Sequence, residues 1–182
     1  IQMGRQLALG REPEHLADGK ASIMSTRAVL TQGKIVALKG LGGFHLVCDA
    51  FNPKAVSTLR QRKLRVDKPF EVMLPDIETV EKHCHLDAAR RALLESDARP
   101  AVILRRRPES AIAREVAPGQ DLLYVMLPST PLQYLLIEKS GAFPEALVMT
   151  SANLVEEPVA ITHEEVRERL LSLADVSLMH TR

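Results

Sequence analysis

At 182 residues the chain is long enough for one domain with a single sizeable core. Its composition, 46% hydrophobic and 26% charged, excludes a disordered chain, and no apolar run approaches the roughly 18 residues of a membrane span. With a net charge of +1 and 3% aromatic residues, the sequence does not suggest a basic surface with stacking platforms for single-stranded nucleic acid.

The cysteines point to a reduced, metal-free protein. Cys48 and Cys84 lie far apart without CxxC spacing, so neither a zinc site nor a disulfide is expected, and both are interpreted as buried structural residues. His83 and His85 flank Cys84, but adjacent residues on a helix point in different directions, which disfavours a metal role. No basic segment followed by an apolar run opens the sequence, and we expect a cytoplasmic protein.

Periodicity and turn signals predict helices and strands that interleave along the chain. Residues 1–20 show weak periodicity and are interpreted as an N-terminal arm or linker, with the folded domain over 21–182. The expected helices are 21–32, one from Pro53, 76–82, 87–94, 131–141 and 162–174, and the expected strands are 34–39, 44–48, 70–74, 100–104, 122–127, 146–149 and 176–179. This order predicts a mixed α/β layer fold.

A glycine-rich turn, Gly40 to Gly43, joins the first two expected strands. Glycine permits positive φ and lets the backbone approach a ligand, so the turn either simply links the strands or contributes to a site. It does not open a helix as GxGxxG does, and it lacks the Lys-Ser/Thr of a P-loop. A dinucleotide fold or a P-loop is therefore not expected.

The strongest candidate site is a cationic stretch that ends the helix from Pro53. It carries five cations in nine residues against the single carboxylate of Asp67: Arg60, Arg62, Lys63, Arg65 and Lys68. Such a density attracts anions, and guanidinium groups suit phosphate oxygens. The alternative is a solvated helix end, where cations stabilise the helix dipole. Pro69 favours an anion site, because it stiffens the entry of the cations into a strand.

Two further strand ends carry polar groups. Arg105, Arg106 and Arg107 follow an expected strand and are interpreted as an exposed strand end rather than a ligand site. Thr150, Ser151 and Asn153 follow the apolar strand 146–149. Their side chains either bond their own loop backbone or face a ligand at the edge of the sheet.

Five ordered motifs together resemble the YrdC-like domain of the HypF carbamoyltransferases over about residues 21–182. The matching stretches are Lys39-Gly40-Leu41-Gly42-Gly43-Phe44-His45-Leu46, Cys48-Asp49-Ala50, Arg62-Lys63-Leu64-Arg65 with Lys68-Pro69-Phe70, Val125-Met126-Leu127-Pro128 with Thr130-Pro131-Leu132, and Val148-Met149-Thr150-Ser151-Ala152-Asn153-Leu154. The resemblance implies a twisted, open, mixed α/β sheet with flanking helices and a basic concave cavity.

The same resemblance implies an activity. The domain is expected to join carbamate, derived from carbamoyl phosphate, to AMP from ATP, forming a carbamoyl-adenylate and releasing pyrophosphate. In the full-length enzyme another domain would pass the carbamoyl group to a HypE-like protein during maturation of nickel–iron hydrogenase. Magnesium is expected to accompany ATP, whereas a dedicated protein metal site, a membrane and a nucleic acid are not expected as partners.

Site residues are assigned through the matched motifs. Lys63 and Arg65 are expected to stabilise the charge that develops in the reaction. The other assigned residues are expected to bind the substrates. Arg62 and Lys68 are assigned to triphosphate and carbamate oxygens, with Arg60 as an alternative to Arg62, Thr130 and Thr150 to the carbamate pocket, and Ser151, Asn153 and Arg182 to the nucleotide.

Departures from the family pattern leave other functions open. Ser129, Gln133-Tyr134 and Val155 replace a tyrosine, a His-His pair and the serine of Ser-Gly-Glu-Pro. One alternative is the related threonylcarbamoyl-AMP synthase, whose Thr-Val-Tyr-Gly-Leu-Gly motif differs from residues 37–42. Another is a non-catalytic RNA-binding module, which the near-zero net charge disfavours. The acylphosphatase-like, zinc-finger and transfer domains do not match this sequence, so we expect a fragment of a longer protein that activates the carbamoyl group without delivering it.

Overall fold

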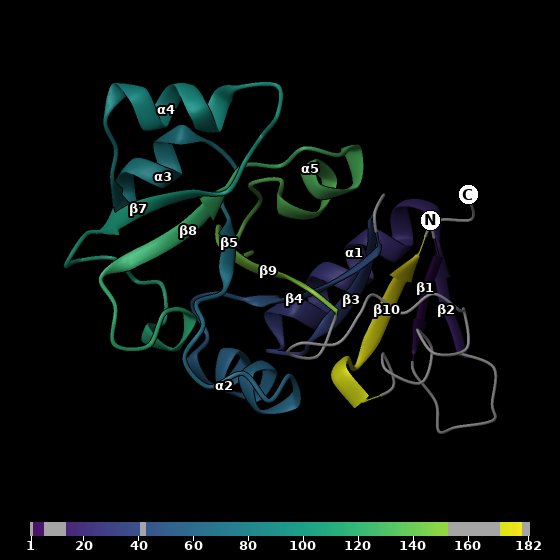
Figure 1. The fold of residues 1–182 in the computed structure, drawn as a ribbon. Helices are drawn as coiled ribbons and strands as arrows, with labels where there is room; N and C mark the ends of the chain where they lie inside the picture. Colours follow the sequence, from purple (N-terminus) through teal and green to yellow (C-terminus); the bar gives the residue numbers. More distant parts are fainter. Residues whose placement is uncertain (1, 6–13, 41–42, 153–171, 180–182) are drawn as a thin grey trace.

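The fold is one mixed sheet with helices on both faces (Figure 1). The computed structural model describes residues 2–5, 14–40, 43–152 and 172–179. In these ranges the sheet has ten strands in the order β2-β1-β10-β3-β4-β9-β5-β8-β7-β6. The strands are β1 Gln2–Arg5, β2 Glu14–Asp18, β3 Val36–Gly40, β4 Gly43–Asp49, β5 Glu71–Met73, β6 Cys84–His85, β7 Val102–Arg106, β8 Leu122–Met126, β9 Leu147–Ser151 and β10 Val176–Met179. Pairs β10–β3 and β5–β8 are parallel and the others are antiparallel, which confirms the mixed α/β sheet.

Most of the helices begin at a residue whose side chain caps them. The helices are α1 Gly19–Thr31, α2 Pro53–Arg62, α3 Ile77–His83, α4 Ala88–Glu95, α5 Pro131–Ile137 and the short 3₁₀ helix η1 Arg114–Val116. The side chains of Asn52, Asp76 and Asp87 accept backbone N–H groups at the starts of α2, α3 and α4. Helix α5 ends at Ile137, four residues before the expected stop at Gly141.

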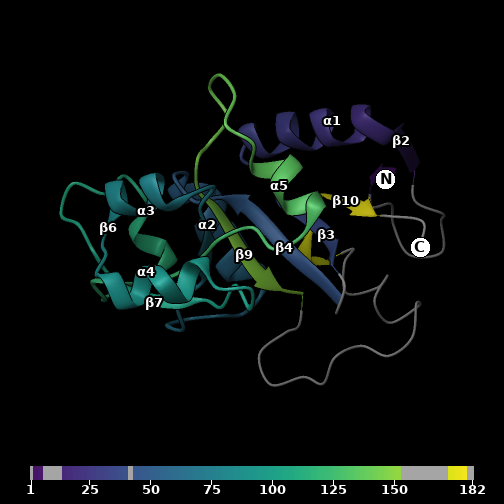
Figure 2. The same cartoon turned by 90° about the horizontal axis from the view of Figure 1, so that it is seen from above.

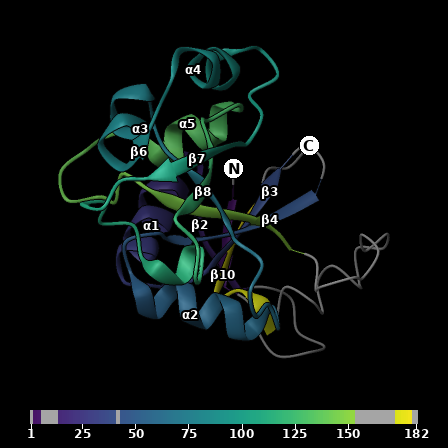
Figure 3. The ribbon, with the colours of Figure 1, turned by 60° about the vertical axis from the view of Figure 1, so that its left-hand side comes forward.

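Alternation along the central strands builds a core on each face of the sheet. On one face, Val36 and Leu38 of β3 pack with Leu30 of α1 and Leu136 of α5. On the other face, a larger set packs under α2, α3 and α4 and includes Ala37, Leu46, Leu59, Val80 and Leu94. Figure 2 shows α1 beside α5, and Figure 3 shows α2 on the opposite side of the sheet from α5. Strands β3 and β9 are therefore largely buried on both faces, whereas β7 exposes alternate residues on one face.

Two local expectations are wrong. Residues 2–5 and 14–18 are not an arm, because they form strands at one edge of the sheet, with β1 paired to β10 and to β2. Antiparallel pairing uses backbone groups and needs no apolar alternation in the segment, so periodicity alone cannot detect it. Cys84 and His85 do not continue a helix but form β6 against β7. The expected helix 162–174 lies largely outside the described residues.

The cysteines have the environment that the sequence predicts. Cys48 and Cys84 are free and buried. Burial raises the pKa of both thiols, so neither is a thiolate at neutral pH. Among the described residues no three His, Cys, Asp or Glu side chains lie together as a metal site would need. No described helix is both long and apolar enough to cross a membrane.

Candidate anion-binding site

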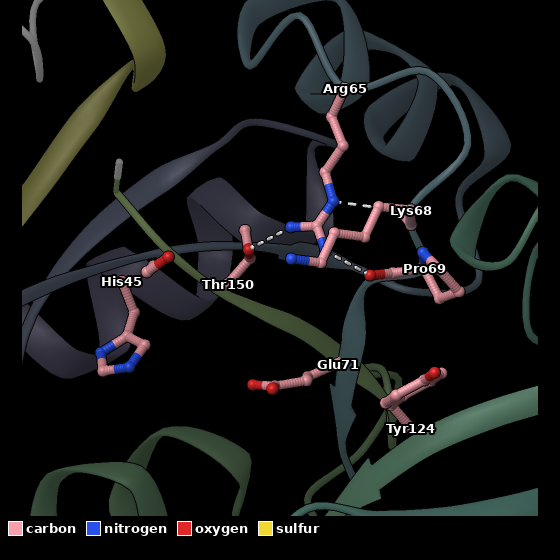
Figure 4. Close-up of a pocket in the computed structure, with 8 residues that line it drawn as sticks. His45, Arg65, Lys68, Pro69, Glu71, Tyr124 and Thr150 are labelled. Atoms are coloured by element: carbon pink, nitrogen blue, oxygen red, sulfur yellow. Dashed lines mark hydrogen bonds between the residues drawn. The ribbon is translucent and has the colours of Figure 1, made fainter. Parts of the chain in front are cut away.

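A cavity of about 290 Å³ opens where β9 runs past the start of its neighbour β5. Strand β9 continues to Ser151, which is paired with His45 of β4, whereas β5 begins at Glu71, opposite Met149. The end of β9 is therefore open on the β5 side. The lining residues, shown in Figure 4, are His45, Arg65, Lys68, Pro69, Glu71, Tyr124, Thr150 and Ser151.

Arg60 shapes the loop that brings cations to this cavity. Its guanidinium is buried and lies 4.6 Å from the centre of the Phe70 ring. It donates hydrogen bonds to the backbone carbonyls of Arg65, Val66, Lys68, Glu115 and Val116. Leu64 turns the chain out of α2 with φ at 52°, a conformation that costs a non-glycine residue roughly 1–2 kcal/mol. Arg60 is thus part of the framework and does not line the cavity.

The head of Arg65 is held in a fixed position on the cavity wall. Its Nε donates to the carbonyl of Lys68 at 3.0 Å, and its two Nη atoms donate to the carbonyl of Pro69 at 2.5 Å and to Thr150 Oγ1 at 3.2 Å (Figure 4). The guanidinium also lies 4.8 Å from the Phe70 ring centre. Burial lowers the pKa of Arg65, but an arginine stays charged at physiological pH.

Two lysines complete the positive end of the cavity. Lys68 is exposed, and its side chain runs into the cavity beside the Arg65 head toward Thr150 (Figure 4). Lys63 is buried behind the wall and donates to the carbonyl of Ser151. Burial, with the nearby charges of Arg65 and Lys68, lowers the pKa of Lys63 to about 8. Three of the predicted cations therefore meet the end of β9, together with the predicted Thr150 and Ser151.

Besides Pro69, three lining residues were not predicted as site residues: His45, Glu71 and Tyr124. Their strands place them on the same face of the sheet. Glu71 pairs with Tyr124 on one side and with Met149 on the other, and Met149 pairs with Val47, two residues from His45. Burial lowers the pKa of His45, so its ring is neutral at physiological pH. Its buried Nδ1 has no hydrogen-bond partner among the described residues. A polar residue within an apolar strand is the signal that could have identified His45.

Gly40 leaves room for the His45 ring. A Cβ atom at Gly40 would lie 3.1 Å from His45 Nδ1, closer than most side chains tolerate. The two residues come from opposite strands of the β3–β4 hairpin, in which Gly40 pairs with Gly43. The glycine turn therefore does more than link two strands, because its first residue permits the placement of a side chain that lines the cavity.

Two predicted residues lie elsewhere. Arg62 donates to Asp175 at 2.9 Å and to the carbonyl of Leu173, because successive helical residues point about 100° apart and Arg62 diverges from Lys63. Thr130 forms a capping box with Gln133 at the start of α5 and does not line the cavity. Asn153 and Arg182 lie outside the described residues, and their assignment stays a prediction.

The second cationic cluster is mostly engaged by the backbone. Arg106 is buried and donates to the carbonyls of Ser110, Ile112 and Ala113. Arg107 donates to the carbonyl of Cys84 and pairs with Glu109 at 3.8 Å. Together with Arg105 these side chains border a hollow of about 390 Å³, which also contains the Arg114–Asp121 ion pair.

The cavity at β9 is therefore suited to an anion. It offers a fixed guanidinium, an ammonium group and a hydroxyl, and none of the lining residues is a cysteine nucleophile. Groups of this kind bind phosphate or carboxylate oxygens and stabilise negative charge as a bond breaks. They provide positioning and electrostatics rather than covalent catalysis.

Comparison with known proteins places the chain beside carbamoyltransferases. The family model Sua5/YciO/YrdC, described as telomere recombination, matches residues 28–182. Carbamoyltransferase HypF2 of Cupriavidus necator is 45% identical in an alignment 173 residues long, and the match covers 88% of this chain and 21% of that protein. The chain therefore spans about a fifth of the length of this curated relative.

Solved structures of HypF proteins also resemble this chain in sequence and in fold. A full-length HypF in its phosphate- and nucleotide-bound form is 43% identical, with a TM-score of 0.80 over 89% of this chain and 21% of that one. HypF of T. kodakarensis is 34% identical, with a TM-score of 0.85 over 98% of this chain and 22% of that one. The Sua5 protein of P. abyssi complexed with L-threonine is 20% identical, with a TM-score of 0.72 over 87% of this chain and 46% of that one, a likeness of fold alone.

Proposed function

Because the chain belongs to the Sua5/YciO/YrdC family, and its similarity to HypF carbamoyltransferases covers most of its length, we propose that it forms a carbamoyl-adenylate from carbamate and ATP. The observation that carries the proposal is the convergence of Lys63, Arg65 and Lys68 on the polar end of β9. Adenylation brings together a carbamate and a triphosphate, which are both anionic. A site for this step must therefore hold positive charge in a fixed arrangement.

The step itself needs no protein nucleophile or base. A carbamate oxygen forms a bond to the α-phosphorus of ATP, and the bond from that phosphorus to the bridging oxygen of the β-phosphate breaks. Pyrophosphate leaves with the electron pair, and no proton has to be removed because the carbamate is already an anion. Arg65 and Lys68 stabilise the equatorial oxygens of the α-phosphate and the oxygens of the departing pyrophosphate. Lys63, buried behind the cavity wall, adds its positive charge to the electrostatic field there.

Magnesium fits this cavity only as a companion of the nucleotide. Glu71 is the one carboxylate among the lining residues, and no dedicated metal cluster is present among the described residues. Mg²⁺ commonly keeps water ligands and binds through substrate phosphates, so phosphate oxygens would supply most of its ligands here. When bound, it would neutralise part of the triphosphate charge.

Delivery to a partner is assigned to the rest of a longer protein. Transfer to a HypE-like protein needs a site that aligns the intermediate with an acceptor thiolate. Cys48 and Cys84 are both buried with raised pKa values, so neither resembles a relay nucleophile. We therefore propose that this domain activates the carbamoyl group and does not deliver it.

Exchange of labelled pyrophosphate into ATP tests the proposal. With carbamate supplied by an ammonium and bicarbonate mixture, we expect exchange that depends on both ammonium and bicarbonate and is lost in Arg65→Ala. Exchange that depends instead on L-threonine with bicarbonate would support a threonylcarbamoyl-AMP synthase. Retention of RNA in a salt-sensitive manner, without any exchange, would indicate a binding module. Carbamoylation of an added HypE-like protein by this chain alone would contradict the proposed division of labour.

A further inference from the structure

Glu71 faces the cations of the cavity without pairing with them. It lines the same cavity as Arg65 and Lys68, yet no ion pair or hydrogen bond of its carboxylate is formed within the described part of the chain. Figure 4 shows the Glu71 carboxylate pointing into the space below the Arg65 and Lys68 heads, on the side of His45. A carboxylate and two cations thus face one open volume from different walls.

The separation is imposed by the fold. Arg65 cannot turn toward Glu71 without giving up its bonds to the carbonyls of Lys68 and Pro69 and to Thr150 Oγ1. Glu71 is the first residue of a central strand, paired on both sides with β8 and β9, so its backbone is equally fixed. The gap between the Glu71 carboxylate and the Arg65 guanidinium is therefore a property of the free protein, and a ligand can occupy it.

We propose that Glu71 is an acceptor subsite that binds the N–H groups of a small anion whose oxygens are held by Arg65 and Lys68. The ligand class is an anion with oxygen acceptors at one end and N–H donors at the other. Carbamate has this arrangement in a single planar group, with a carboxylate at one end and an amino group at the other. Bicarbonate, its closest competitor in shape and charge, has a hydroxyl group in place of the amino group.

This inference rests on the proposed function and adds the basis of substrate selection to it. Glu71 is exposed in the free protein, so an anion with N–H groups can donate to its carboxylate, whereas an anion without donors only brings a second negative charge close to it. The neighbouring His45 is neutral and brings no opposing positive charge to this end of the cavity. The cavity volume of about 290 Å³ is ample for a ligand of this size.

The test uses two stable anions that differ only in their N–H donors. Sulfamate carries an amino group where methanesulfonate carries a methyl group, and both are tetrahedral monoanions. Each is titrated into the 182-residue chain without divalent cations, so that Glu71 cannot act through a metal, and amide signals are followed by nuclear magnetic resonance. The variants are Glu71→Ala, Glu71→Gln, and the control Glu109→Ala, which removes the same charge from the Arg107 loop.

For the wild type and Glu109→Ala we expect sulfamate to bind about tenfold more tightly than methanesulfonate, the scale of a hydrogen bond to a charged group. Glu71→Ala should bind both anions equally, and Glu71→Gln, which retains one acceptor oxygen, should keep part of the preference. Equal affinities in the wild type, no binding of either anion, or an unchanged preference in Glu71→Ala would each overturn the subsite. Tighter binding of L-threonine than of sulfamate, dependent on Glu71, would overturn its assignment to carbamate.

These outcomes are separable from the proposed reaction. A sulfamate preference that depends on Glu71, found in a chain without pyrophosphate exchange, would support the subsite and contradict the adenylation step. Carbamate-dependent exchange that continues unchanged in Glu71→Ala would do the reverse.

Discussion

Two stretches of this chain concentrate positive charge: residues 60–68 at the end of α2 and residues 105–107 at the end of β7. The charged groups of the two stretches make different contacts. In the first, Arg60 holds the loop from inside while Lys63, Arg65 and Lys68 reach one polar strand end. In the second, Arg106 turns inward to carbonyls, and Arg107 is shared between a carbonyl and a carboxylate.

Charge density therefore does not by itself define an anion site. Both stretches border a hollow, and that of the second is the larger, at about 390 Å³ against about 290 Å³. The first stretch differs because separate elements bring a second set of polar groups, from β9, to the same point. Convergence of cations with these groups is what makes it the better candidate.

The largest effect should come from the framework of the first stretch. Arg60→Ala removes the hydrogen bonds of a buried guanidinium to five backbone carbonyls, of which only that of Lys68 keeps a second charged donor, and we expect the free energy of unfolding to fall by about 3 kcal/mol or more. Arg105→Ala, at an exposed position, should change it by less than about 0.5 kcal/mol. Urea denaturation measures both, and equal effects would contradict the distinction between the two stretches.

Nucleotide affinity should separate the two stretches next. Arg65→Ala and Lys63→Ala should each weaken ATP binding by roughly 1–3 kcal/mol, the scale of a lost charge-assisted hydrogen bond. Arg105→Ala removes the same charge from the other stretch and should leave ATP affinity within about twofold. Calorimetric titration with ATP provides the measurement. Unchanged affinity in both variants of the first stretch would remove the basis for placing the triphosphate there.

The pH dependence of ATP binding should identify Lys63 within the first stretch. Burial, followed by the charges of Arg65 and Lys68, lowers the pKa of Lys63 from 10.5 to about 8. Between these values the unfolded chain holds a proton that the native protein has lost, so this group makes the free energy of unfolding rise with pH. Phosphate binding needs the charged amine, so ATP affinity should fall through the same window, by about tenfold.

Two variants control for other titrating groups. Lys63→Met keeps the buried stem and should abolish both trends, whereas Lys68→Met should retain them because Lys68 is exposed. ATP affinity and urea unfolding are measured from pH 7 to pH 10. A wild-type affinity that stays constant over this range would show that the Lys63 charge does not assist binding.

The smallest effect concerns the hydroxyl that holds an arginine head in the first stretch. Thr150→Val removes the acceptor of the Arg65 Nη1 hydrogen bond, and we expect ATP affinity to fall by about 0.5–1.5 kcal/mol. Thr130→Ala should instead lower the free energy of unfolding by about 1 kcal/mol through loss of the α5 cap, with ATP affinity unchanged. Thermal melts with and without ATP distinguish these results, and a reversed pattern would return Thr130 to the binding site.

Much of the fold follows from local sequence signals. Caps at Asn52, Asp76 and Asp87 predict the helix starts, and short continuous apolar runs predict the buried strands β3, β4 and β9. These signals act within a few residues of chain, so they can be recognised without knowing the partners. The ordered motifs also predict the family and the cationic loop that leads into β5.

The sequence alone indicated the mixed α/β fold and included Lys63, Arg65, Lys68, Thr150 and Ser151 among its site candidates, and the structure brings these five residues to one place. Tertiary structure decided what no local pattern encodes. It moved Arg62 to Asp175, used Thr130 as a helix cap and brought His45, Glu71 and Tyr124 from three strands to the same cavity. Helical rotation turns residues that are adjacent in sequence in different directions, and strand pairing brings together residues that are far apart in sequence. The direction of a side chain and its neighbours therefore depend on contacts that only the folded chain makes.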